Sequence, residues 1–179
     1  HPTRLNNTFD LYKRGWRGIN VDMNSLTIDL FNFCRAGDIN INCAVSNKES
    51  IKTYYSNGEL SPENTLEKNH LLFLNKNFNI NNQDFKSKKT KTKTLTNILK
   101  KNKFYKVDFL NIDLEGHELK VIKKFNFALF NIKIICIEVL NHNIKSTKNN
   151  KEIQKILKKN NFTLSKKIGV NYFYKNKNF

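Results

Sequence analysis

Two nearly continuous apolar runs, separated by one helical pattern, constrain the fold of this chain more than any other feature. The runs cover residues 107–114 and 132–140, and strands that are buried on both faces have this character. Between them, Leu119, Ile122 and Phe125 recur at helical spacing. A strand, a helix and a second strand in this order predict a parallel sheet that is covered by helices.

Helices and strands alternate along the rest of the chain as well. We expect further helices at residues 9–12, 26–34, 95–99 and 153–157, strands at residues 18–22, 39–45 and 51–55, and a closing hairpin at residues 162–174. The second helix would begin at Asn24 and bury its apolar positions Leu26, Leu30, Phe33 and Cys34. The fold class that follows is α/β, with a mostly parallel sheet and an antiparallel hairpin at its C-terminal end.

Residues 59–93 interrupt this alternation. The stretch contains one short apolar group at residues 71–74, and residues 86–93 are only Lys, Thr and Ser. We expect a long mobile connection that could act as a lid, with simple disorder as the alternative. Because no linker or repeat divides the 179 residues, residues 1–179 are expected to form a single domain.

The formal net charge of +17 invites a nucleic-acid interpretation. Only four of the 32 basic residues are arginines, and arginine is the residue that binds phosphates and guanine edges in a bidentate manner. We therefore favour the coding habit of an AT-rich genome as the source of the lysines. A basic RNA-binding module that uses residues 86–106, or an RNA methyltransferase, is the alternative.

Other function classes find little support. No apolar stretch approaches the length of a membrane span, and no P-loop or Gly-x-Ser-x-Gly elbow is present. The three cysteines lie far apart in apolar runs without a Cys-x-x-Cys pair, which favours a reducing, cytoplasmic location. The histidines and cysteines lack metal-ligand spacing, so we expect no metal site; a metal held by Asp113, Glu115 or His117 is the alternative.

Carboxylates occupy the positions where the predicted strands end. Asp22 closes one strand, and Asp113 and Glu115 follow the apolar run at residues 107–114, just before Gly116. Ligands of parallel α/β sheets bind at this edge. In nucleotide-binding folds, an acid at a strand tip accepts hydrogen bonds from ribose about 20 residues after a glycine-rich turn. Glu138, inside the second apolar run, needs a hydrogen-bonding partner.

Several segments together resemble the FkbM-type S-adenosylmethionine-dependent methyltransferases. They are residues 7–22, with Gly-Trp-Arg-Gly-Ile at 15–19, residues 41–46, 93–95 and 107–118, with Asp-Leu-Glu-Gly-His-Glu at 113–118, and residues 137–139. The resemblance implies a Rossmann-like class I methyltransferase sheet and S-adenosyl-L-methionine as cofactor. The family's first strand and its glycine-containing turn would precede His1, so we expect an N-terminally truncated sequence whose sheet lacks that strand.

The resemblance also implies roles for individual residues. The cofactor-binding set would be Asp22, which would hold the ribose, Met23, Asp38, Ala44 and Val45 around the nucleoside, and Asp113 facing the reaction site. Methyl transfer requires an aligned acceptor and a group that removes its proton. The candidates for that base are Glu115, His117 and Glu118.

O-methylation of a small hydroxyl compound or a sugar is the activity that the family suggests most strongly, with that small molecule as the partner. An inactive truncated fragment is a further alternative. Unpaired strand edges beside a missing strand would favour association with a second copy of the chain, giving a homo-oligomer.

Overall fold

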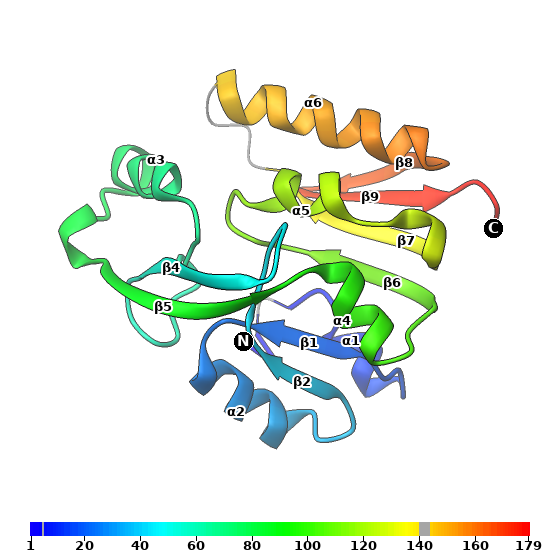
Figure 1. Cartoon of the computed structure of the whole chain (residues 1–179), viewed down its shortest axis with the longest axis horizontal. Coiled ribbons are helices and arrows are strands. Elements are labelled where there is room, and N and C mark those ends of the chain that lie inside the picture. The colour runs from blue at the N-terminus through cyan, green and yellow to red at the C-terminus, as the bar shows by residue number, and fades with distance from the viewer. Residues whose placement is uncertain (5, 140–143) are drawn as a thin grey trace.

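The computed structural model describes residues 1–4, 6–139 and 144–179, and the strands in this part of the chain form three hydrogen-bonded groups (Figure 1). In the first group, β1 (Ile19–Asp22) pairs in parallel with β2 (Ile39–Asn42). The second group has the order β3 (Ala44–Val45), β5 (Lys86–Lys93), β4 (Ser50–Ser56). The third has the order β6 (Lys106–Ile112), β7 (Asn131–Glu138), β9 (Asn171–Asn176), β8 (Phe162–Ile168).

The third group confirms the two strands that were predicted from the apolar runs, and also the closing hairpin. β6 and β7 pair in parallel, and β9 and β8 continue the sheet in antiparallel fashion. Ile135 and Ile137 of β7 are fully buried, as is Leu157 of the helix that covers this sheet. The protein is therefore a mixed α/β structure whose hydrophobic core lies between this sheet and its helices. Leu140, at the end of the second predicted run, lies outside the described residues.

Helices connect and cover these strands. They are α1 (Phe9–Lys13), α2 (Ser25–Cys34), α3 (Lys68–Phe78), α4 (Leu95–Lys101), α5 (Glu118–Lys124) and α6 (Ile144–Lys159), with short 3-10 turns at Asn82–Asp84 and Phe127–Leu129. The side chain of Asn24 accepts from the amide of Leu26 (2.9 Å) and so caps α2, as expected. α6 lies along β8 and β9 (Figure 1). Among the described helices, none is long and apolar enough to cross a membrane.

Simple disorder, one of the two expectations for residues 59–93, is wrong at residues 86–93, and the lid stays a prediction. These residues form β5, which pairs with β4 from Lys86 to Thr92. Backbone pairing requires no apolar side chains, and Thr92 adds buried hydrogen bonds to the carbonyl oxygens of Lys48 and Ser50 (2.8 and 3.0 Å). The apolar residues 71–74 lie within α3.

Two further expectations are corrected. The buried positions of α2 are Thr27, Ile28 and Phe31, whereas Phe33 is 87% exposed. The prediction failed because helical periodicity shows that apolar residues share one face of a helix but does not show which face packs against the sheet. The alternating run at residues 39–45 is divided at Cys43. Its first half pairs with β1 and its second half pairs with β5.

Candidate functional site

Two strand edges face each other across a cavity of the molecule. Among the described residues, β1 pairs only with β2 and β6 pairs only with β7, so each strand keeps one free edge. β1 and β6 run in the same direction (Figure 1). A cavity of about 380 Å³ between them is lined by every residue of both strands. We call it the interstrand cavity.

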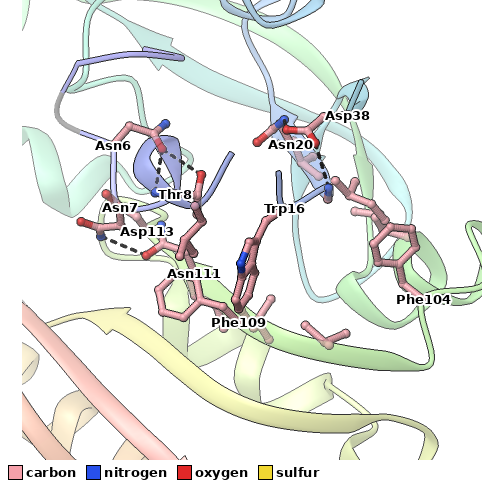
Figure 2. A pocket seen from close by; sticks show the side chains of 18 of the residues that line it. Asn6, Asn7, Thr8, Trp16, Asn20, Asp38, Phe104, Phe109, Asn111 and Asp113 are labelled. Carbon is pink, nitrogen blue, oxygen red and sulfur yellow. Dashed lines mark hydrogen bonds between the residues drawn. The ribbon is translucent and has the colours of Figure 1, made fainter. Parts of the chain in front are cut away.

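The two aspartates that end these strands share this cavity. Asp22 is the last residue of β1 and Asp113 follows β6 directly, and both line the cavity. Partial burial raises the pKa of each carboxyl, and Asp22 also accepts a hydrogen bond from the amide of Asn24 (2.8 Å). The carboxyl edge of both strands therefore opens into one crevice, which Figure 2 shows at Asp113.

Asp38 lies at the amino end of β2, whereas Asp22 and Asp113 lie at the carboxyl ends of their strands. It precedes that strand, and its carboxylate accepts hydrogen bonds from the amide of Gly18 (2.8 Å) and from the side chain of Asn20 (3.0 Å). Because β1 and β2 are parallel, Asp38 and Asp22 mark opposite ends of the interstrand cavity. Asp38 fastens the start of β1, away from Asp113 (Figure 2).

The other residues expected around a nucleoside are divided among three places. Val45 lines the interstrand cavity. Met23 lines a second cavity of about 430 Å³ together with Asn42 and residues 88–91. Ala44 is buried beside Thr92 of β5 and lines neither cavity.

Three carboxylates gather just beyond β6 and β7. Oxygens of Asp113, Glu115 and Glu138 lie within 4.8 Å of one another, and we call this group the carboxylate cluster. Burial, followed by the charges of Asp113 and Glu115, raises the pKa of Glu138 to about 9. Burial and the neighbouring carboxylates therefore favour a proton on the Asp113–Glu138 pair at neutral pH. Such oxygens could hold a proton or a divalent cation.

His117 does not face the cavity. Its ring is 1% exposed, with Nε2 2.9 Å from Oγ of Ser46 and Nδ1 2.5 Å from a carboxylate oxygen of Glu67. Lys120 binds the same oxygen of Glu67 from the solvent side. We call Ser46, His117, Glu67 and Lys120 the histidine clamp, because they tie together the segments after β3, before α3 and after β6.

Glu118 also has a structural role. Its carboxylate accepts hydrogen bonds from the amides of Leu114 (2.9 Å) and Gly116 (3.2 Å), which shapes the turn after β6. Gly116 has φ of +92° there, a conformation that glycine adopts without strain. Burial raises the pKa of Glu118 to about 7. Of the three predicted bases, Glu115 belongs to the carboxylate cluster, where it also lies 3.0 Å from the ring of His70.

Sequence patterns did not identify the polar wall that the N-terminal segment adds to the interstrand cavity. Asn6, Asn7 and Thr8 line it, and the amide of Asn7 donates to the side-chain oxygens of Asn111 (3.0 Å) and Asn171 (3.1 Å). Trp16, Phe109 and Asn111 stand in the same space (Figure 2). Isolated amides carry no spacing signal, so only tertiary contacts reveal this wall.

A comparison with protein families gives a match over most of the chain. Residues 2–164 match the model of the family described as Methyltransferase FkbM domain. Searches of curated proteins and of solved structures returned no match.

Proposed function

The chain belongs to the FkbM methyltransferase family, and we propose that it transfers a methyl group from S-adenosylmethionine to a hydroxyl group of a small molecule or sugar. One observation carries this proposal: Asp22 and Asp113, from strands far apart in the sequence, line one cavity at the carboxyl ends of β1 and β6. Ligands of parallel α/β sheets bind at that edge.

We further infer that β2 and β1 belong to the same Rossmann-like sheet as β6, β7, β9 and β8, with room for one strand between β1 and β6. The common direction of β1 and β6, their free edges and the interstrand cavity support this inference. A parallel strand between β1 and β6 would form hydrogen bonds with the backbone amides and carbonyls on the free edges of both strands.

The chemistry of the lining residues fits the proposed cofactor. The carboxylate of Asp22 can accept hydrogen bonds from ribose hydroxyls, and the second cavity beside Met23 and Asn42 offers a place for the base. Asp113 and its neighbours supply negative charge for a sulfonium at the other side of the crevice. When bound, the cofactor supplies an activated methyl group. Asp38 and Ala44 have no direct part in this assignment.

The proton of the acceptor hydroxyl needs a base, and we assign that role to Glu115. It lies within the carboxylate cluster, whereas both nitrogens of His117 and the carboxylate of Glu118 are engaged in holding the turn. The protonated Asp113–Glu138 pair keeps the number of negative charges beside Glu115 low, which limits repulsion within the cluster.

Isothermal titration calorimetry with S-adenosylhomocysteine tests the cofactor site. We expect the parent chain to bind and Asp22→Asn to weaken binding about tenfold, which is the loss of one charge-assisted hydrogen bond. The matched control is Asp29→Asn, on the exposed side of α2, which should bind as the parent does. A parent chain without measurable binding would overturn the proposal.

A further inference from the structure

Arg35 is a buried cation held by neutral groups of the N-terminal segment. Its side chain is 1% exposed, although it follows the last turn of α2. The guanidinium donates to the carbonyl oxygen of Pro2 through Nε (2.9 Å) and Nη2, to Oδ1 of Asn6 through Nη2 (2.8 Å) and to Oγ1 of Thr8 through Nη1 (2.8 Å). No ion pair joins Arg35 to a carboxylate within the described residues.

Three aromatic rings complete this environment. The guanidinium carbon of Arg35 lies 5.1 to 5.6 Å from the ring centres of Phe9, Tyr12 and Phe31. Burial deprives the charge of solvent and so lowers the pKa of Arg35. Hydrogen bonds and ring contacts offset the free-energy cost of burying the charge only while the N-terminal segment stays in place. The guanidinium and the segment therefore hold each other.

The segment that Arg35 holds is also the polar wall of the interstrand cavity. Asn6 and Thr8, two of its partners, line the cavity, and Asn7 between them reaches Asn111 of β6. Oδ1 of Asn6 additionally accepts hydrogen bonds from the amide and hydroxyl of Thr8 (2.9 and 2.8 Å). Hydrogen bonds at its two sides thus connect the N-terminal segment to the end of α2 through Arg35 and to β6 through Asn111.

We propose that Arg35 is a positioning residue for the cofactor cavity, because its buried guanidinium fixes Asn6–Thr8 as the wall that joins the β1 side to β6. This inference rests on the proposed function, since it concerns the affinity of the same cavity. Lysine cannot replace arginine here. A single ammonium group has no planar fork with which to reach three acceptors at once.

The test compares Arg35→Lys with Arg14→Lys, which changes an exposed arginine in the same way. Two quantities are measured: the affinity for S-adenosylhomocysteine by calorimetry, and the hydrogen-exchange rate of the Thr8 amide without ligand. For Arg35→Lys we expect about tenfold weaker binding and about tenfold faster exchange, with Arg14→Lys unchanged in both. Thr8→Val removes one acceptor while Arg35 remains, and should show the same two effects at about threefold each, even if Arg35→Lys fails to fold.

The outcomes separate the inference from its premise. Faster exchange together with weaker binding supports the positioning role. Faster exchange with unchanged affinity overturns it, because Arg35 would then serve stability alone, and unchanged exchange overturns it directly. A parent chain that binds no S-adenosylhomocysteine overturns the proposed function, and the positioning role with it, whatever the exchange rates show.

Discussion

The carboxylate cluster and the histidine clamp lie on either side of the turn at Gly116, and their electrostatics are opposite. In the clamp, burial would raise the pKa of Glu67, but hydrogen bonds from His117 and Lys120 lower it. In the cluster, burial and neighbouring carboxylates raise the pKa of Glu138 to about 9. The clamp is a compensated structural network. The cluster keeps like charges together beside a cavity, which is characteristic of functional sites.

The largest effect should come from removing the centre of the clamp. His117→Ala leaves a buried hollow and removes one hydrogen-bonding partner each from Ser46 and Glu67, so we expect the free energy of unfolding to fall by about 3 kcal/mol. Lys120→Ala is the matched control, because Lys120 binds the same carboxylate with a side chain that is 54% exposed. It should cost about 0.5 kcal/mol. Urea unfolding measures both, and equal losses would mean that the clamp is not a structural network.

Glu115→Gln should separate chemistry from stability in the cluster. Removing the proposed base is expected to lower turnover about 100-fold while unfolding in urea stays near that of the parent. Turnover is followed as S-adenosylhomocysteine released with a panel of monosaccharides, and Glu152→Gln on α6, exposed beside Lys123, serves as control. If Glu115→Gln keeps the turnover of the parent, the base lies elsewhere and the contrast between cluster and clamp loses its functional meaning.

The shared proton of Glu138 should appear as a pH dependence of stability. The folded state holds this proton more tightly than the unfolded chain, so the free energy of unfolding falls as the pH rises from about 5 to about 9. Glu118, with a pKa of about 7, contributes mainly to the lower part of that range. Between about pH 7 and pH 9 the parent should lose roughly 2 kcal/mol that Glu138→Gln does not lose. Thermal unfolding at both pH values checks this, and parallel losses would contradict a shared proton.

The smallest expected effect concerns the lysines of β5. If function resides at the carboxylate edge, these lysines form no nucleic-acid interface, and mixed-sequence RNA should show no steeply salt-dependent binding at physiological ionic strength. Fluorescence anisotropy with labelled RNA, repeated with Lys89→Glu, measures this. Binding that falls steeply with salt and is lost in Lys89→Glu would favour the RNA-binding alternative over the small-molecule one.

Local patterns predicted those parts of the molecule that depend on neighbouring residues. Asn24 caps α2, and α4 begins at Leu95, as the sequence predicted. The hairpin at the C-terminal end also forms where turn residues separate two strand patterns. Local patterns failed for α2, whose buried stripe differs from the predicted one, and for β5, whose polar sequence forms a strand because β4 pairs with it.

The candidate site shows the same division. Asp22 and Asp113 were predictable, because parallel strands carry their ends to one edge and an acid at that position is visible in the sequence. The sequence indicated that the buried carboxyl of Glu138 needs a partner, but it did not indicate which residue that partner is. Asp113 fills that place from 25 residues away along the chain.

The sequence by itself determined the α/β class, the order of most elements and the two aspartates at the strand ends, because periodicity, caps and turns act over a few residues. Only the tertiary structure decided that Asp38 lies at the opposite end from Asp22, that His117 is sealed within a clamp, and that Arg35 holds the N-terminal wall of the cavity. These contacts join segments far apart in the chain. They depend on how burial balances charge and hydrogen bonding in three dimensions, and no local pattern records that balance.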